Sequence, residues 1–425
     1  MKFYFDILGG RLLEAFISSF LASKVLKDIS FSHDVNIHLI STVNPSLNIR
    51  VPFCRFQCPF CLFVNYPYNE AISDLYVKAV KRELKLYSTY IKESTIENIY
   101  FSGGTPSLIS NRLGDILNCI HELFGFIGNV AIEVNPLDLN DETLSRLVNT
   151  GINQISIGIQ SFNSGVLEGI GRKYSSEVAL NAVKKAMDGG FDYVNIDLMF
   201  PLPNQTVSSL LQDLEIAVKL GVHGISTYPL MLLPYTEMYK QLKDRSVNIK
   251  KMEKEMYMLI LDYLMNVGYD VRSIWSFTVK PGFYNGPFEY DEYLGIGPYA
   301  WGIIDNSFII NTPLLEEYLV MVKKKIPIAA LARFEGEKSM IIWLSRSLYH
   351  GKASKTEFYK RFKVGLDKKF KWLIYLMRLS GLAEWNADSL RLTRKGLLYG
   401  SLTTKKIVIG LLMKMHKATG YYPPL

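Results

Sequence analysis

The sequence has few cysteines and no long uncharged apolar run, and each shortage excludes a class of protein. Four cysteines in 425 residues exclude a scaffold held together by disulfides. No stretch of about 18 apolar residues runs without a charge, which argues against a membrane-spanning helix. Asp6, Arg11 and Glu14 interrupt the first apolar residues, so the N-terminus does not resemble a secretory signal. We therefore expect a cytoplasmic protein.

Acidic residues are missing from the C-terminal end of the chain. The net charge is +8, and the segment 391–425 has no Asp or Glu but seven basic residues, which are Arg391, Arg394, Lys395, Lys405, Lys406, Lys414 and Lys417. A solvated face explains such a bias, as does an anionic substrate, a membrane surface or nucleic acid. With 48% apolar and 21% charged residues, the chain can form packed cores. Its length allows two or three domains.

Three of the four cysteines lie close together. Cys54, Cys58 and Cys61 have the spacing C-x3-C-x2-C, and the nearest downstream cysteine is Cys119. A structural zinc site takes four ligands, whereas three thiolates suit a [4Fe–4S] cluster with one iron left open for chemistry. The spacing therefore favours a cluster, with zinc or inert buried thiols as alternatives. Cys119 lies in a helical pattern and is expected to be a small buried residue.

Further motifs carry a resemblance to a known family. The C-x3-C-x-aromatic-C motif, with Phe60 as the aromatic residue, resembles the radical S-adenosylmethionine (SAM) superfamily. Within it, the chain is similar to the relatives of oxygen-independent coproporphyrinogen III oxidase and its haem-chaperone paralogue. The resemblance covers roughly residues 47–302 and rests on Ser102-Gly103-Gly104-Thr105-Pro106-Ser107, Glu133-Val134-Asn135-Pro136, Ile155–Phe162, Asn195–Thr206, Ile225–Leu230 and Tyr293–Gly297.

The resemblance implies two cofactors and a set of residues that bind them. In the superfamily, an electron from a [4Fe–4S] cluster cleaves SAM and releases a 5′-deoxyadenosyl radical. By this resemblance, Cys54, Cys58 and Cys61 are the cluster ligands and the catalytic centre. The residues expected to contact SAM are Phe60, Gly103, Gly104, Thr105, Glu133, Gln160, Arg172 and Asp197.

Elementary chemistry is consistent with these roles. Gly103 and Gly104 follow an apolar strand pattern, and glycine lets the backbone approach a ligand closely. Glu133 ends another apolar run, where a carboxylate suits a cationic ligand in a dry site. The Arg172 guanidinium suits the methionine carboxylate. An ordinary turn, a surface carboxylate and a surface arginine are the alternatives for these positions, and Phe60 could shield the cluster instead of contacting adenine.

Strand and helix patterns alternate along the first half of the chain. Six strands with helices between them predict an α/β fold, a partial (β/α)6 barrel of the radical SAM type. Its chemistry is expected at the carboxyl ends of the strands. The strands are predicted at 47–51, 97–101, 129–134, 154–159, 193–198 and 224–228, and the clearest helices at 74–90, 111–123, 176–188 and 206–220.

The remainder of the chain is predicted to add three parts to the barrel core of residues 47–232. Residues 1–46 form an N-terminal helical arm, and residues 233–310 extend the barrel. From about residue 311 the composition turns helical and basic, so residues 311–425 are expected to form a winged-helix-like C-terminal domain. A helix at Lys405–Lys417 has apolar residues beside its lysines, so it either packs on the barrel or contacts a membrane interface.

The departures from the family pattern lie on the expected substrate side. Relatives usually have Tyr and His at the positions of Asn48 and Arg50, and the oxidases usually have Cys-x-Cys where this chain has Cys61-Leu62-Phe63. These differences disfavour plain oxidation of coproporphyrinogen. Gln154 likewise stands where an arginine is usual. The residues expected to bind SAM are kept, whereas those near the substrate have changed.

The sequence thus predicts a radical SAM enzyme that acts on a large, partly apolar substrate, by oxidation or methylation of a tetrapyrrole. The alternatives are a haem chaperone with little turnover, a class C-type methyltransferase acting on a different substrate, and a nucleic-acid binder. A flavodoxin or ferredoxin is the expected reductant, and the chain is expected to be a monomer. Fold alone does not establish function, so the winged-helix resemblance does not by itself imply DNA binding.

Overall fold

The computed structural model describes residues 2–33, 45–91, 95–125, 128–281, 292–304 and 306–421. The chain forms two compact units, each discontinuous in sequence. The barrel unit comprises Phe31–Met256, Thr278–Arg333 and Met415–Leu425, and the helical unit comprises Met1–Ser30, Tyr257–Phe277 and Phe334–Lys414. The predicted boundaries at residues 46, 232 and 310 remain predictions, because neither unit is a continuous stretch of chain.

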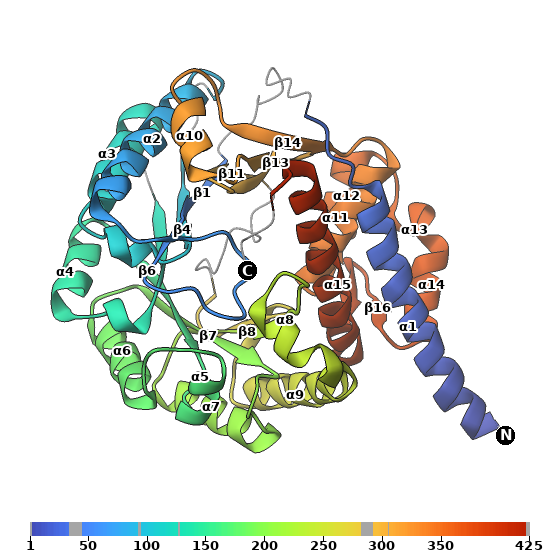
Figure 1. Ribbon diagram of the computed structural model, residues 1–425. Helices are drawn as coiled ribbons and strands as arrows, with labels where there is room; N and C mark the ends of the chain where they lie inside the picture. Colours follow the sequence, from blue (N-terminus) through green and yellow to red (C-terminus); the bar gives the residue numbers. More distant parts are fainter. Residues whose placement is uncertain are drawn as a thin grey trace. The chain divides into compact units, whose positions relative to one another are not determined.

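Six parallel strands form the centre of the barrel unit (Figure 1), as predicted. They pair in the order β1-β4-β5-β6-β7-β8, and every neighbouring pair is parallel. Apolar runs form these strands because helices cover them on the outside. The six strands are β1 (Ser46–Val51), β4 (Asn98–Gly103), β5 (Asn129–Val134), β6 (Gln154–Gln160), β7 (Tyr193–Phe200) and β8 (Gly224–Pro229).

Capped amphipathic helices connect the strands. Ser175 caps α6 by accepting a hydrogen bond from Val178 N, and Thr206 and Ser209 form a capping box at α7, so the predicted helix starts have a physical basis. Figure 1 shows these helices on the outside of the strands. The helices are α2 (Glu70–Ser88), α3 (Leu113–Phe124), α4 (Asp141–Asn149), α5 (Ser164–Gly169), α6 (Ser176–Asp188) and α7 (Val207–Lys219), with 3₁₀ turns η2 (Pro106–Ile109) and η3 (Pro136–Asp138).

A second group of strands extends the sheet beyond β1. β11 (Tyr293–Ile296) pairs parallel to β1, and β12 (Trp301–Ile304), β13 (Ser307–Asn311) and β14 (Ile328–Arg333) continue it antiparallel. The composition from residue 311 predicts mainly helix, and β14 departs from this prediction because its apolar run pairs with β13. Short elements complete the unit: β2 (Phe53–Cys54), β3 (Tyr66–Pro67), α8 (Glu237–Leu242), η4 (Lys243–Arg245) and α10 (Leu315–Met321).

The helical unit contains a small antiparallel sheet. Its strands β15 (Lys352–Ser354), β17 (Ser389–Leu392) and β16 (Ala383–Trp385) pair in that order. The helices before and between them are α11 (Glu337–Tyr349), α12 (Lys355–Phe362), α13 (Leu366–Lys369) and α14 (Lys371–Leu379). This order of one helix, one strand, further helices and a two-stranded hairpin is the winged-helix-like arrangement that the sequence predicts.

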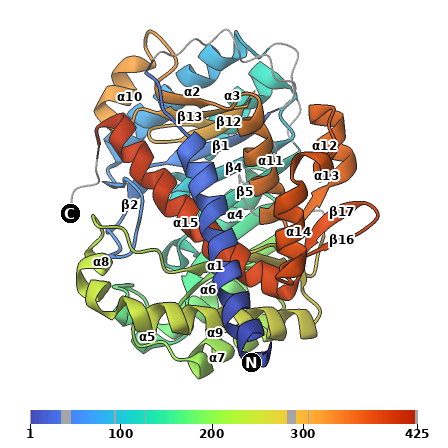
Figure 2. The ribbon, with the colours of Figure 1, turned by 90° about the vertical axis from the view of Figure 1, so that its right-hand side faces the viewer.

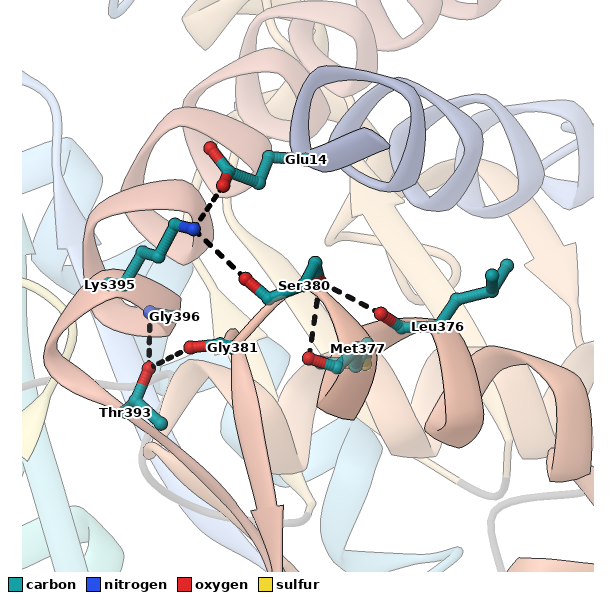
Figure 3. Close-up of polar contacts among 8 residues, drawn as sticks. All are labelled: Glu14, Leu376, Met377, Ser380, Gly381, Thr393, Lys395 and Gly396. Atoms are coloured by element: carbon teal, nitrogen blue, oxygen red, sulfur yellow. Dashed lines mark hydrogen bonds and ion pairs between the residues drawn. The ribbon is translucent and has the colours of Figure 1, made fainter. Parts of the chain in front are cut away.

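Two long helices complete the helical unit. Within it, α1 (Lys2–Asp28) lies beside α15 (Arg394–Thr419), as Figure 2 shows, and Thr403 donates a hydrogen bond of 2.7 Å to Ser18 between them. In Figure 3, Lys395 lies between the buried Glu14 carboxylate and the carbonyl of Ser380, with Lys395 Nζ 2.9 Å from that oxygen. The remaining elements in the described part of the chain are helix α9 (Ser246–Asn266) and the short strands β9 (Asp270–Ser273) and β10 (Ser276–Thr278).

Helix α15 is, in the described part of the chain, the one helix long and apolar enough to cross a membrane by length and composition alone. The sequence-based observation that no apolar run of about 18 residues is free of charge holds for α15 as well, because Lys405 and Lys406 interrupt its apolar residues. Its contacts are those of a packed helix: Leu412 is buried, and a Cβ on Gly410 would clash with the Leu26 side chain of α1. The predicted helix at 405–417 is part of α15.

Candidate functional site

The three clustered cysteines lie just after strand β1, at the carboxyl end of the barrel strands. Cys54 belongs to β2, which pairs with β3 through Phe53 and Tyr66, and the Cys61 amide closes a turn by donating to Cys58 O at 3.0 Å. All three side chains are half-buried. Burial raises the pKa of the Cys54 thiol to about 12, so binding a metal centre there requires loss of a proton. We call residues 54–61 the cysteine loop.

Each of these thiols has a hydrogen-bond donor of its own. The donors come from three separate segments of the barrel unit. The pairs are Thr105 Oγ1 with Cys54 Sγ at 3.6 Å, Arg172 Nη1 with Cys58 Sγ at 3.6 Å, and Asn65 Nδ2 with Cys61 Sγ at 3.3 Å. Such donors stabilise the thiolate form and tune a bound cluster.

Two glycines allow strand β4 and the cysteine loop to approach closely. Gly103 has a φ of 119°, a value that residues with a side chain rarely adopt. A Cβ on Gly104 would lie 3.0 Å from Cys54 Sγ and even closer to Phe53 O, and the Gly104 amide donates to Val51 O at 2.7 Å. The predicted glycine pair therefore has a geometric reason: any side chain at Gly104 would displace the cysteine loop.

Two half-buried carboxyl groups lie on β5 and β7, where Glu133 is the last residue but one of β5 and Asp197 lies inside β7, three residues before its end. Glu133 accepts from Tyr100 Oη at 3.0 Å and from the Gly103 amide at 3.2 Å, and Ser156 donates to Asp197 at 3.2 Å. Burial raises the pKa of Glu133 to about 7. Burial, together with the nearby Glu133 charge, raises the pKa of Asp197 to about 7. A cation bound between them would favour ionisation of both groups.

Strand β6 ends in an unusual backbone conformation. Gln160 has a φ of 68° although it is not glycine, and the β6–β7 register shifts between Ile157 and Gln160. Such outliers persist only where the surroundings hold them and are concentrated at functional sites. A Cβ on Gly158 would lie 3.1 Å from Gln160 Nε2 and 3.5 Å from an Arg172 nitrogen, so Gly158 provides room for both side chains.

Arg172 reaches into the site from the segment before α6. Its guanidinium lies 5.4 Å above the Phe60 ring and 5.6 Å above the Tyr174 ring, and it donates to Gly158 O at 3.3 Å. Arg172 Nε is buried and has no hydrogen-bond partner among the described residues. A guanidinium with an unused buried N–H can donate a hydrogen bond to a carboxylate group of a ligand.

All the predicted site residues meet at one cavity of about 200 Å³. The cavity is partly open to solvent, and it is lined by the three clustered cysteines together with polar and charged residues. Its lining includes every residue that the sequence predicts for the cluster or for SAM: Cys54, Cys58, Cys61, Phe60, Gly103, Gly104, Thr105, Glu133, Gln160, Arg172 and Asp197. Among the described residues, no three His, Cys, Asp or Glu side chains converge closely enough for a single metal ion.

The same cavity contains residues that the sequence reasoning missed. Asn65, Asp138 and Gly158 line it, and Asp138 forms an ion pair of 2.8 Å with Arg55 of the cysteine loop. Asp138 also accepts from Ser107 at 2.9 Å. Their sequence signals are weak: Asn65 follows the last cysteine by four residues, and Asp138 follows Asn135-Pro136-Leu137 at the end of β5.

The two departures on β1 have partners inside the protein. Asn48 accepts from Ser102 at 2.6 Å. Arg50 is buried and donates to Val64 O at 2.5 Å and to Asn65 Oδ1 at 3.2 Å, and Asn65 in turn donates to Cys61. Arg50 therefore fixes the segment that follows the cysteine loop. Cys119, by contrast, is buried in α3 as predicted.

A cysteine loop and a polar cavity at the carboxyl ends of parallel barrel strands define the radical SAM class of site. The sequence profile of the Radical SAM superfamily matches residues 48–217. The chain is 26% identical to the heme chaperone HemW of Bacillus subtilis over 371 residues. This alignment covers 84% of this chain and 97% of that protein.

Two further comparisons find similarity to proteins of the same kind. The chain is 32% identical to the heme chaperone HemW of Buchnera aphidicola (subspecies Acyrthosiphon pisum) over 281 residues, 63% of this chain and 73% of that protein. Among solved structures it is similar in fold to coproporphyrinogen III oxidase (HemN) from Escherichia coli, with a TM-score of 0.76, 19% identity and coverage of 90% and 94% of the two chains.

The chain belongs to the family of the heme chaperone HemW, and its residues 48–217 match the radical SAM superfamily. The cofactors of this class are a [4Fe–4S] cluster and SAM. The residues present fit both groups: three thiols with donors face the cavity, Gly104 leaves room beside Cys54, and the unused Arg172 Nε can bind a carboxylate.

Proposed function

We propose that this protein cleaves SAM reductively at a [4Fe–4S] cluster and uses the resulting radical on a tetrapyrrole-type substrate. The observation that carries the proposal is the cavity itself, where three thiols, two half-buried carboxyl groups and a guanidinium with a buried Nε meet. When bound, the cluster supplies an electron to SAM. Thr105, Arg172 and Asn65 steady the thiolates, and Glu133 and Asp197 offer negative charge to the cationic ligand.

The chain's own residues would orient SAM in a defined way. The unused Nε of Arg172 suits the methionine carboxylate, and Gln160 and Asp197 suit hydroxyl groups of the ribose. The Gly103–Gly104 segment brings backbone groups close to the methionine end. Keeping the ligand in a cavity walled by Phe60 and Phe63 limits water near the reacting atoms, which protects a reactive species.

The decisive experiment measures the products of SAM in protein reconstituted with iron and sulfide under anaerobic conditions. After reduction with dithionite, we expect 5′-deoxyadenosine at amounts that exceed the protein concentration when coproporphyrinogen III or haem is added. S-adenosylhomocysteine would instead indicate methyl transfer. The Cys58→Ala variant should form no product, while Cys119→Ala should behave like the parent protein. No deoxyadenosine from fully loaded protein would contradict the proposal.

The second candidate function is haem delivery with little turnover. It is favoured by the similarity to the heme chaperone HemW, which extends over 97% of the Bacillus subtilis protein, and by Cys61-Leu62-Phe63 in place of the Cys-x-Cys of the oxidases. Haem titration followed by the Soret band distinguishes the two functions. Stoichiometric haem binding with at most a single turnover of SAM supports delivery, whereas abundant deoxyadenosine without haem binding excludes it.

We also propose a cytoplasmic location and a flavodoxin or ferredoxin as the physiological reductant. Both follow from the chemistry of the class, since an oxygen-sensitive cluster with an open iron needs a reducing compartment and a low-potential electron donor. A pull-down of the reconstituted protein against purified flavodoxin and ferredoxin tests the second point. If neither flavodoxin nor ferredoxin supports deoxyadenosine formation where dithionite succeeds, these donors are rejected.

A further inference from the structure

Helix α14 of the helical unit has an exposed apolar face. Trp372, Tyr375 and Leu379 are 74%, 54% and 64% exposed, and their spacing of three and four residues aligns them along one side of the helix. The Trp372 and Tyr375 rings contact each other edge to face at 6.2 Å. The opposite side of α14 is buried through Ile374 and Met377. A soluble surface rarely exposes three large apolar side chains in a row.

Basic residues surround this face. Between residues 355 and 379 the chain has two acids, Glu357 and Asp367, and eight basic residues, which are Lys355, Lys360, Arg361, Lys363, Lys368, Lys369, Lys371 and Arg378. Lys355 binds backbone carbonyls, and Lys369 pairs with Glu337. Lys371 and Arg378 are exposed on α14 itself. The positive charge therefore lies on the same helix as the apolar face and on the segments just before it.

The composition of α14 distinguishes between anionic partners. In a winged-helix arrangement, α14 stands where a DNA-binding protein has its recognition helix. Reading base edges requires side chains such as Arg, Asn, Gln, Ser and Thr, but the sequence Lys-Trp-Leu-Ile-Tyr-Leu-Met-Arg-Leu has no Asn, Gln, Ser or Thr. Trp and Tyr are instead enriched at membrane interfaces, and a basic helix with an apolar face binds anionic lipid surfaces.

We propose that α14 docks this protein on an anionic membrane surface. Trp372, Tyr375 and Leu379 enter the headgroup region, while Lys371, Arg378 and the preceding Lys368 contact lipid phosphates. We call these six residues the α14 patch. Charge complementarity favours an anionic partner, because a segment with net positive charge surrounds the apolar face. The three apolar side chains of this face stay exposed among the described residues.

The test is partition of the full-length reconstituted protein onto lipid vesicles by flotation. Vesicles of phosphatidylglycerol with phosphatidylcholine should bind the protein, and binding should fall with salt. Vesicles of phosphatidylcholine alone should bind it at least about tenfold more weakly. Brominated lipid should quench Trp372, and Trp372→Phe should lose this quenching while keeping most of the partition.

Two variant sets and their matched controls follow. The combined change Lys368→Gln, Lys371→Gln and Arg378→Gln should lower partition roughly a hundredfold. The control changes three exposed lysines of the barrel unit, Lys323, Lys324 and Lys325, to Gln and should leave it unchanged. Replacing Trp372, Tyr375 and Leu379 with Ser should lower partition at least about tenfold. The control is Phe16→Ser with Phe20→Ser, an exposed aromatic pair on α1.

Circular dichroism confirms that each variant is folded, and the Trp372→Phe quenching measurement does not depend on the multiple substitutions. Failure of the parent protein to bind phosphatidylglycerol vesicles overturns the proposal, as does equal loss in the control variants. Tight binding of a DNA duplex that the α14 variants abolish, without vesicle binding, would identify nucleic acid as the partner instead. Because SAM cleavage is measured separately, a negative result here leaves the proposed catalytic function untouched.

Discussion

Two walls of the site differ in how their polar side chains are hydrogen-bonded. On the wall formed by β5 to β7 and the segment before α6, Glu133, Asp197 and Arg172 line the cavity and direct charge or donors at it. The β1 wall lies behind the lining residues, and its Asn48 and Arg50 form their hydrogen bonds with neighbouring chain segments. The first wall is arranged for a ligand and the second for the protein itself. Changes on the two walls should therefore affect different measurements.

The largest expected effect lies where the two walls meet, at the cysteine loop. Replacing Cys54, Cys58 or Cys61 singly with Ala should abolish the visible absorbance of the reconstituted protein or make it labile, because a cluster with an open iron depends on three thiolates. Iron analysis and absorbance near 400 nm check this. Cys119→Ala should bind iron normally, and an equal loss there would reject the assignment of the ligands.

The next largest expected effect is on the free energy of unfolding, in which variants of Arg50 and Glu133 should differ. Arg50→Ala leaves the carbonyls of Val64 and Pro298 without their donor and opens a cavity, so the free energy of unfolding should fall by about 3 kcal/mol. Glu133→Gln removes one half-buried charge and keeps the size of the side chain, so it should keep the free energy of unfolding within about 1 kcal/mol. Denaturant unfolding measures both values.

In SAM binding the order should be reversed. Glu133→Gln should weaken SAM binding roughly tenfold or more, since it removes an anionic partner of the ligand. Arg50→Lys, which keeps the charge, should bind SAM close to normally once loaded with its cluster. Calorimetry on folded, cluster-loaded protein measures both. If the Arg50 variant loses SAM affinity and the Glu133 variant does not, the division of the two walls is wrong.

A pH titration sharpens the same contrast. Burial raises the pKa of Glu133 and of Asp197 to about 7, so both carboxyl groups are largely protonated at pH 6 in the absence of a ligand. Cationic SAM favours their ionised forms, so binding should release protons, and affinity should rise from pH 6 through pH 7 and level off roughly one unit above the pKa of the free carboxyl groups. Glu133→Gln should reduce the proton release measured in buffers of different ionisation enthalpy. An affinity that falls over this range would contradict the argument.

The smallest predicted effect concerns Asn65, which connects Arg50 to Cys61. Asn65→Leu removes one donor to sulfur while leaving all three ligands in place, so the cluster should form but be lost to chelators about tenfold faster. Its reduction potential should also become more negative. Asn65→Gln is the matched variant that keeps the amide. A potential unchanged in Asn65→Leu would show that the contact is only structural.

The sequence predicts the framework better than it predicts the fine contacts. The strands at 129–134 and 154–159 are found at β5 and β6 within one residue, because apolar β-rich runs end at polar residues in every unit. The predicted site residues are brought together because parallel strands end at one edge of a barrel. Their individual roles remain predictions.

The sequence could not reveal what depends on distant contacts. The positive φ of Gln160 follows from the register shift against β7, and no local motif encodes it. Likewise, the sequence shows Arg50 only as a residue that stands where relatives usually have a histidine. Its structural role depends on Val64 and Pro298, which are 14 and 248 residues away in the sequence. Strand β14 is similar, since its pairing with β13 outweighs the helical composition around it.

The sulfur donors have one more consequence. Thr105, Arg172 and Asn65 belong to three segments that no single strand or helix ties together. The ease with which a bound cluster would accept an electron would therefore depend on the positions of these three segments. A molecule that entered the cavity and shifted one of them would alter electron uptake without touching the iron, so occupancy of the cavity would control when an electron is consumed.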